Sequence, residues 1–122
     1  MNLDELRAYC NAKPGVSEDF PFDEKHLVLR VGGKIFAITD VTSERLRVNL
    51  KCDPALADEL RQLHPEITPG YHMNKRHWNT VDFAGAVPEE RLLWLLDHSY
   101  ALVLAGLPKS KREAIGEEEG PC

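Results

Sequence analysis

The sequence HLVLRVGGKIFAIT at residues 26–39 contains two β-prone runs separated by Gly32 and Gly33. The favoured two-residue turns between antiparallel strands need positive φ angles, which glycine adopts without steric strain. These residues therefore predict a β-hairpin.

The expected register of this hairpin assigns its side chains to two faces. A two-residue loop predicts three pairs beside the turn: Val31 with Lys34, Arg30 with Ile35 and Leu29 with Phe36. Because paired residues share a face, one face would hold Leu27, Leu29, Phe36 and Ile38. The other face would hold His26, Val28, Arg30, Ile35, Ala37 and Thr39.

The segment Arg45–Lys51 alternates strictly between polar and apolar residues. Alternation of period two is typical of a half-buried strand, so Leu46, Val48 and Leu50 are expected to point inward. The outward side would carry Arg45, Arg47, Asn49 and Lys51.

Helices and shorter strands are predicted around these three strands. Asn2 with Glu5 resembles a capping box at a first helix start, and Asp53 with Pro54 begins a second helix. The longest helix is expected from Pro88 to about residue 105, and its sheet-facing side would carry Leu92, Leu95, Leu96, Ser99, Leu102 and Val103. The remaining segments predict a loop at Ser17–Glu24, a short strand around Tyr71–Met73 and another at Trp78–Phe83. Helices gathered on one face of an antiparallel sheet give a two-layer α+β domain of order α-β(3)-α-β(2)-α, whose other face stays open.

A chain of 122 residues is expected to form one domain. Its three cysteines are far apart and show no CxxC spacing, which is typical of a reducing compartment. No apolar run approaches the ~20 residues that span a bilayer. We therefore expect a cytoplasmic protein without a membrane partner.

The net charge is -5, whereas nucleic-acid binders usually carry a basic surface. The positive charge is concentrated in two segments, however. Residues 25–51 contain six basic and two acidic side chains, and residues 71–80 add Lys75 and Arg76 without an acid. The arrangement of these two segments in the fold therefore decides whether a basic surface exists.

No catalytic or metal-ligating pattern emerges from the sequence. The spacings of His64, His72 and His77 match no zinc motif. Asp97-His98-Ser99 contains triad residue types, but consecutive helical residues point in different directions. Cys52 lies next to a helix start that could lower its pKa, although a structural role is the preferred interpretation. We expect a non-enzymatic protein with no metal and no cofactor.

The block NKRHWNT at residues 74–80 combines two cations, an imidazole, an indole and two amides. Phosphate contacts and base stacking use such groups. Alternatively, Trp78 anchors a turn in the core while Lys75 and Arg76 are merely solvated. Both interpretations remain open at this point.

This block resembles the signature of the MmcQ/YjbR family. The other matching stretches are LRAYCNAKPG at 6–15, KIFAI at 34–38, VNLK at 48–51, PGYHMNKRHW at 69–78 followed by Thr80 and Val81, and LLDHSY at 95–100. The resemblance covers residues 1–113 and leaves an acidic tail at residues 114–122, which is expected to be disordered. It implies a fold shared with CyaY-like and type III secretion-chaperone-like domains.

The resemblance also implies weak DNA binding through a "double wing" of strands and loops. The implied contact residues are Arg30, Lys34, Arg45, Arg47, Lys51, Asn74, Lys75, Arg76 and Trp78. The alternative is a protein- or peptide-binding module that uses the partly apolar face of Val28, Ile35 and Ala37. A monomer is expected, although the protein-binding alternative also allows self-association.

Overall fold

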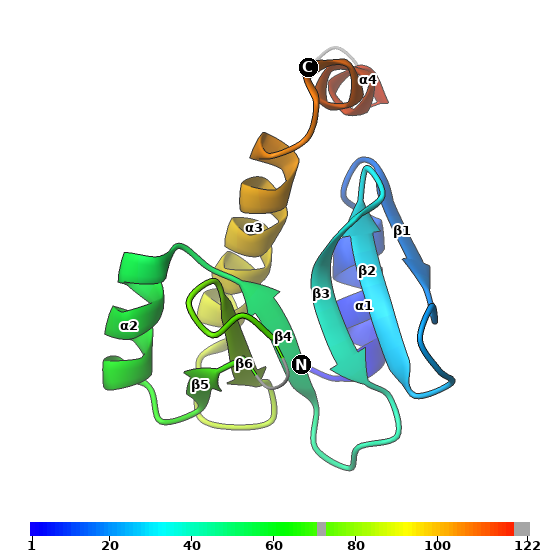
Figure 1. Cartoon of the computed structure of the whole chain (residues 1–122). Coiled ribbons are helices and arrows are strands. Elements are labelled where there is room, and N and C mark those ends of the chain that lie inside the picture. Colours follow the sequence, from blue (N-terminus) through cyan, green and yellow to red (C-terminus); the bar gives the residue numbers. More distant parts are fainter. Residues whose placement is uncertain (71–72, 119–122) are drawn as a thin grey trace.

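The computed structural model describes residues 1–70 and 73–118, which form four helices and one six-stranded sheet (Figure 1). The strands are β1 (Val16–Asp19), β2 (His26–Val31), β3 (Lys34–Asp40), β4 (Arg47–Lys51), β5 (Ile67–Pro69) and β6 (Trp78–Asp82). The helices are α1 (Leu3–Asn11), α2 (Pro54–Leu63), α3 (Glu89–Ala105) and α4 (Lys109–Glu118). All strand pairs are antiparallel, in the order β1-β2-β3-β4-β6-β5. The predicted α+β class is confirmed.

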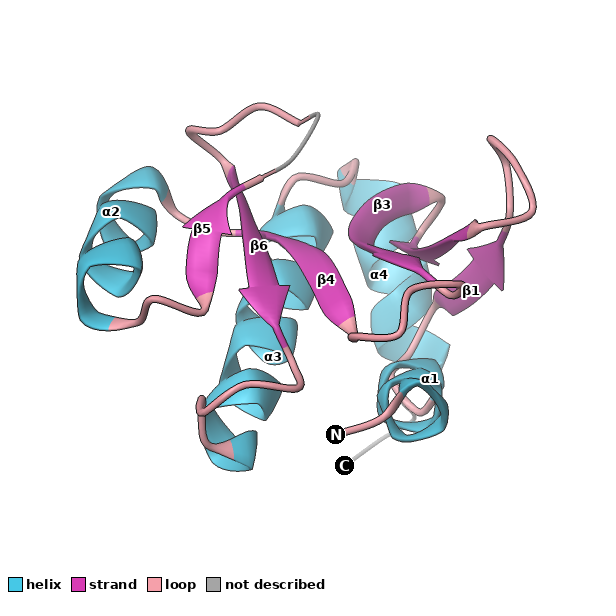
Figure 2. Cartoon of the chain, turned by 90° about the horizontal axis from the view of Figure 1, so that it is seen from below, coloured by secondary structure: helices cyan, strands magenta, loops and turns pink. Residues whose placement is uncertain are grey.

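Helices α1 and α3 lie on the same side of the sheet (Figure 2). Helix α3 packs against the central strands β2, β3 and β4, while α2 packs beside β5. The core between these layers is apolar and includes Leu6, Leu29, Phe36, Val48, Leu50, Leu92 and Leu96. We call the opposite side of the sheet, which α1 and α3 leave uncovered, the open face.

The helix starts follow the local signals in the sequence. The Asn2 side chain accepts a hydrogen bond from the Glu5 N–H at 2.8 Å, and the Glu5 carboxylate accepts one from the Asn2 N–H at 3.1 Å. This pair is the predicted capping box. Asp53 caps α2 by accepting a hydrogen bond from the Leu56 N–H. Both ends are determined by residues within one turn of the helix.

The hairpin of β2 and β3 confirms two predicted pairs and corrects the third. Gly32 and Gly33 have φ angles of 56° and 85°, as the tight turn requires. The pairs nearest the turn are those expected, but a β-bulge then places Leu29 opposite Ala37 instead of Phe36.

The bulge reverses the faces of β3 beyond Phe36. Ala37 belongs to the core and Thr39 is buried, whereas Ile38 lines a groove on the open face. The prediction that Ile38 points inward and Ala37 and Thr39 outward was therefore wrong. One extra residue in a strand inverts the alternation after it, and the pattern of apolar residues in β3 is too uniform to reveal this.

Ser99 of α3 compensates for the irregularity that the bulge creates. The regular pairing of β3 with β4 ends at Ala37 and Leu50. Beyond that point the fully buried Ser99 hydroxyl donates to the Phe36 carbonyl oxygen at 2.6 Å and accepts from the Lys51 N–H at 2.9 Å. One side chain thus satisfies two backbone groups that would otherwise be buried without partners.

The N-terminal edge of the sheet differs from the expectation. Residues Val16–Asp19 form β1, although a loop was predicted from Ser17. The sequence VSED has little intrinsic β preference, and its strand conformation comes from pairing with β2. Tertiary pairing therefore overrides local propensity here.

Two further strand predictions also need adjustment. The short strand before β6 is at Ile67–Pro69, Met73 lies in a bend, and residues 71–72 of the predicted strand lie outside the described residues. Strand β4 begins at Arg47, so Arg45 belongs to the preceding turn.

Helix α4 covers the hairpin turn at the end of the molecule. Its buried Ile115 packs against Gly15, where an added Cβ would lie 2.8 Å from the Ile115 side chain. Residues 114–118 of the predicted tail belong to this helix, and residues 119–122 lie outside the described part of the chain. Among the described helices, none has both the length and the apolar character required to cross a membrane.

Candidate nucleic-acid interface

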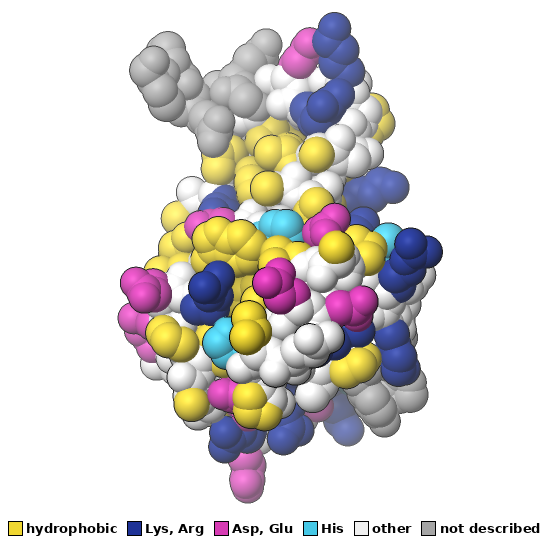
Figure 3. Space-filling model, turned by 90° about the vertical axis from the view of Figure 1, so that its left-hand side faces the viewer, with side chains coloured by type: hydrophobic (Ala, Val, Ile, Leu, Met, Phe, Trp, Pro, Cys, Tyr) yellow, Lys and Arg dark blue, Asp and Glu magenta, His cyan; other side chains and the backbone are white. Residues whose placement is uncertain are grey.

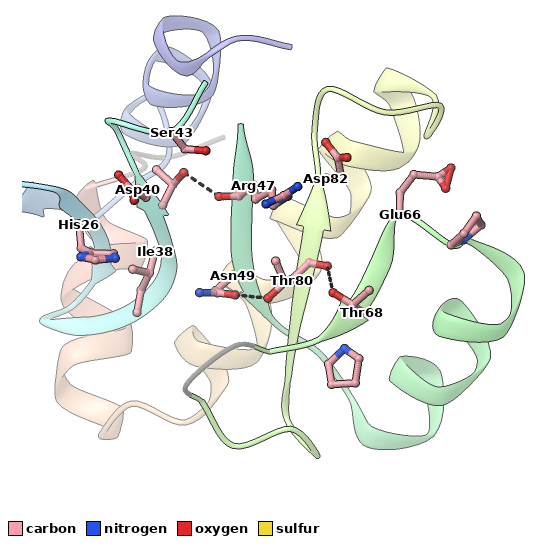
Figure 4. Close-up of a pocket in the computed structure, with 13 residues that line it drawn as sticks. His26, Ile38, Asp40, Ser43, Arg47, Asn49, Glu66, Thr68, Thr80 and Asp82 are labelled. Atoms are coloured by element: carbon pink, nitrogen blue, oxygen red, sulfur yellow. Dashed lines mark hydrogen bonds between the residues drawn. The ribbon is translucent and has the colours of Figure 1, made fainter. Parts of the chain in front are cut away.

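The open face contains a groove of about 570 Å³ over strands β3 to β6 (Figure 4). Across its floor, the strand register places Ile38, Asn49, Thr80 and Thr68 side by side. The Thr80 hydroxyl donates to the Asn49 side-chain oxygen, and the Thr68 hydroxyl donates to the Thr80 carbonyl oxygen. The floor is therefore a row of three short polar side chains that ends at the apolar Ile38.

One end of this face is rich in carboxylates. We call this region, which contains the carboxylates of Asp40, Glu66 and Asp82, the acidic end. Arg45 and Arg47 lie beside these carboxylates and are counted as part of it. The Arg45 guanidinium binds Asp82 with an Nε–Oδ2 distance of 2.5 Å, and Arg47 lies opposite Asp82 in the strand register. Hydrogen bonds from Thr42 hold the pKa of Asp40 below its usual range, so this carboxyl is charged at neutral pH. Arg45 is thus neutralised by an ion pair, and Arg47 lies beside the same carboxylate.

The opposite end of the same face is cationic. We define the basic end as Lys51, Asn74, Lys75, Arg76 and Trp78. Lys51 is paired with Trp78 across the strands, and the Cys52 N–H donates to the His77 carbonyl oxygen at 2.8 Å. Among the described residues, no carboxylate forms an ion pair with Lys51, Lys75 or Arg76. These cations are therefore available to an anionic partner.

Arg61 of α2 holds the loop of the basic end from beneath. Its guanidinium donates to the Asn79 side-chain oxygen at 2.7 Å, to the Trp78 carbonyl oxygen at 3.2 Å and to the Lys75 carbonyl oxygen. Asn79 is only 2 % exposed, and the bonds to Asn79 and Trp78 are part-buried, whereas the bond to Lys75 lies at the surface. These contacts anchor the backbone of the loop at Lys75 and Trp78, and the Lys75 and Arg76 side chains are exposed.

The sequence did not reveal the role of Arg61. Its position on the amphipathic helix α2 resembles that of any solvated arginine, and its acceptors lie 14 to 18 residues away along the chain. A buried, bidentate guanidinium is a common way to fix several carbonyl groups at once, but only the folded chain brings them together.

Asn74 has a structural role in the same loop. Its side-chain oxygen accepts from the Arg76 N–H at 3.0 Å, and its carbonyl oxygen accepts from the N–H groups of His77 and Trp78. Asn74 therefore shapes the turn that presents the two cations.

The nine residues expected to contact DNA fall into separate groups. Lys51, Asn74, Lys75, Arg76 and Trp78 come together at the basic end. Arg45 and Arg47 lie at the acidic end. Arg30 is paired with Asp19 on the neighbouring strand at 3.0 Å. Lys34 is paired in register with Val31, a core residue, and so starts β3 on the helix side of the sheet.

The apolar surface expected for a protein partner is largely absent. Val28 and Ala37 are both buried, and Ala37 belongs to the core. The exposed large apolar side chains lie elsewhere, with Phe20 and Phe22 in the loop between β1 and β2. On another side of the molecule, Figure 3 shows hydrophobic side chains interspersed with charged ones.

The residues that resembled catalytic groups serve separate structural contacts. Asp97 accepts from the Tyr9 hydroxyl at 2.7 Å, His98 accepts from the Asp53 N–H, and Ser99 bridges β3 and β4. Burial raises the pKa of the Cys52 thiol to about 11, so the neighbouring helix start does not activate it. In the described part of the chain, no group of three His, Cys, Asp or Glu residues is arranged to hold a metal ion.

The fold and this surface define a small α+β domain with an open antiparallel sheet. The YjbR family model matches residues 11–102, and the chain belongs to this family. It is 37 % identical over 115 residues to the YjbR protein of Escherichia coli K12, covering 94 % of this chain and 98 % of that protein. The YyaQ protein of Bacillus subtilis is 30 % identical over 116 residues, covering 84 % of this chain and 98 % of that relative.

Solved structures agree with this assignment. The crystal structure of Deinococcus radiodurans protein DR2400, with a DUF419 domain, matches with a TM-score of 0.89 and 46 % identity. The match covers 94 % of this chain and 88 % of that one. A Pseudomonas syringae protein matches with a TM-score of 0.72 and 27 % identity, covering 84 % and 99 % of the two chains. Family and fold are thus established, and function has to be argued from the surface.

Proposed function

We propose that this chain is a non-enzymatic protein that binds DNA weakly through the basic end of its open face. The observation that carries the proposal is the cluster of Lys51, Lys75 and Arg76 beside Trp78, in which the cations have no carboxylate partner among the described residues. Each cation that meets a phosphate releases condensed counterions, which favours binding at low salt. With only about three such contacts, the affinity is modest and falls with salt with a logarithmic slope of roughly -2 to -3.

The proposal differs from a binding site spread over the whole sheet. Arg30 and Arg45 are already paired with Asp19 and Asp82, so a phosphate would have to compete with a carboxylate for them. Arg47 lies between the carboxylates of the acidic end. The footprint is therefore confined to the loop before β6 and the end of β4.

Fluorescence anisotropy with a labelled DNA oligonucleotide at ~50 mM salt tests this proposal. Lys75→Glu is expected to weaken binding about tenfold or more, because it replaces an attraction to phosphate by a repulsion. Arg91→Glu makes the same charge change at the start of α3, away from the open face, and serves as the matched control. Arg45→Glu should have a smaller effect than Lys75→Glu. Absence of binding at this salt concentration to either duplex or single-stranded DNA would sink the proposal.

A further inference from the structure

Trp78 is the aromatic side chain of the basic end. It starts β6 on the open face, since it is paired with Lys51 and alternates with the buried Asn79. Its backbone and Cβ pack on Gly70, where an added Cβ would lie 2.8 Å from the Trp78 Cβ. The side chain is half-buried, and in the described part of the chain no other ring or cation stacks on the indole.

The second tryptophan has a different environment. Trp94 of α3 stacks on His98 with ring centroids 4.9 Å apart, and the Arg91 guanidinium lies over its ring. Trp94 is 41 % exposed, yet its ring already has partners from its own helix. Of the two, Trp78 is therefore the indole that can accept a stacking partner from outside.

The charge distribution restricts the shape of an anionic ligand. Lys51 and Arg47 are four residues apart on β4, so the basic and acidic ends are separated by about 13 Å. A duplex carries roughly one charge per 1.7 Å of its axis and is stiff over this length. A duplex lying along the open face would bring phosphates over Asp40 and Asp82. A single strand can contact the basic end and bend away.

We infer that the preferred ligand is single-stranded nucleic acid, with one unpaired base stacked on Trp78 and the flanking phosphates bound by Lys51, Lys75 and Arg76. This inference rests on the proposed function and names its substrate class. An aromatic ring beside a short cationic stretch is the combination that single strands require, because every base offers a ring face and only two or three phosphates need neutralising. Little sequence preference is expected, since stacking tolerates any base.

The test uses a Trp94→Phe variant of the full chain, in which Trp78 is the only tryptophan. Anisotropy at ~50 mM salt compares a labelled 12-nucleotide single strand of mixed sequence with the same sequence as a duplex. The single strand is expected to bind at least about tenfold more tightly and to quench the Trp78 fluorescence. In the wild-type background, Trp78→Ala should lose about tenfold in single-strand affinity, whereas Trp78→Phe should keep most of it.

Trp94→Ala is the matched control and should leave binding unchanged. Circular dichroism establishes that each variant is folded, and the quenching in the Trp94→Phe variant tests stacking without removing Trp78. Equal or tighter binding to the duplex, or single-strand binding without quenching, would overturn this inference and leave the proposed function standing. Absence of binding to both ligands would overturn the two together.

Discussion

The basic and acidic ends of the open face lie on the same strands, and their outward side chains follow the same alternation. Their basic side chains differ, however, in whether carboxylates lie beside them. Arg45 and Arg47 lie next to carboxylates contributed by the neighbouring strands and loops. Lys51, two positions beyond Asn49 on β4, meets Trp78 and the cationic loop instead. Alternation along one strand assigns a side chain to a face, but the strand beside it decides whether the charge is neutralised.

The two ends also differ in which side chain forms hydrogen bonds with the backbone where β3 and β4 meet. At the basic end, Ser99 of α3 bridges the two strands. At the acidic end, the buried Thr39 hydroxyl donates to the Arg47 carbonyl oxygen at 2.8 Å from within the sheet. The bridging hydroxyl at the basic end therefore comes from a helix, whereas the one at the acidic end comes from the sheet itself.

The largest expected effect is the loss of this bridge in Ser99→Ala. The substitution leaves the Phe36 carbonyl and the Lys51 N–H buried without a partner, which should lower the free energy of unfolding by about 2 kcal/mol. Urea unfolding followed by circular dichroism measures the change. Thr39→Val is the matched control at the acidic end and should cost less, because it leaves only one carbonyl unpaired. A Ser99→Ala variant as stable as the wild type would contradict the proposed difference.

Removing negative charge from the acidic end should allow both ends of the open face to accept DNA phosphates. The double variant Asp40→Asn, Asp82→Asn removes two negative charges from the face and releases Arg45. Duplex affinity should rise about tenfold, which corresponds to ~1.4 kcal/mol, because the repulsion of phosphates over this end disappears. Anisotropy with duplex DNA at low salt measures the gain, and Glu59→Gln on α2, an exposed residue that forms no ion pair with the described residues, controls for net charge. An unchanged duplex affinity would mean that the acidic end does not limit the ligand.

Replacing Arg61 by Lys should loosen the basic end alone. Lysine keeps the charge but cannot span the carbonyl groups of Lys75 and Trp78 together with Asn79, so the loop should lose about 1 kcal/mol of local stability. Trypsin cleaves after lysine and arginine, and cleavage after Lys75 and Arg76 should become severalfold faster under native conditions. Arg91→Lys should leave this cleavage unchanged. Equal cleavage rates in Arg61→Lys and the wild type would show that the contacts of Arg61 do not hold the loop.

The smallest expected effect is a change in the pH dependence of stability caused by His98. This residue lies on helix α3, outside both ends of the open face. Burial lowers the pKa of His98, whose Nε2 accepts a hydrogen bond from the Asp53 N–H, while the nearby Asp53 carboxylate opposes this shift. The unfolded chain therefore binds more protons than the folded one near the ordinary histidine pKa of about 6.5, and stability should fall as the pH drops through that value. Unfolding midpoints at pH 7.5 and 5.5 should differ less in His98→Gln than in the wild type. The same difference in both proteins would refute this assignment.

Local sequence signals predicted much of the fold because their physical causes are local. The capping box at Asn2, the cap at Asp53 and the positive φ angles of Gly32 and Gly33 depend on residues a few positions apart. The hydrophobic pattern of α3 likewise predicted which of its residues face the sheet, including Leu92, Leu96 and Ser99. The bulge in β3 and the strand β1 could not be predicted in this way, because each depends on pairing with another strand.

The sequence by itself determined the starts of α1 and α2, the hairpin turn, the α+β class and the dense polar block of residues 74–80. Only the tertiary structure decided which charges on the open face are neutralised. It pairs Arg30 with Asp19 and Arg45 with Asp82, places Arg61 beneath Lys75 and Trp78, and leaves three cations together at one end. The physical reason is that an ion pair across strands depends on register and loop geometry, which short-range propensity and alternation do not contain.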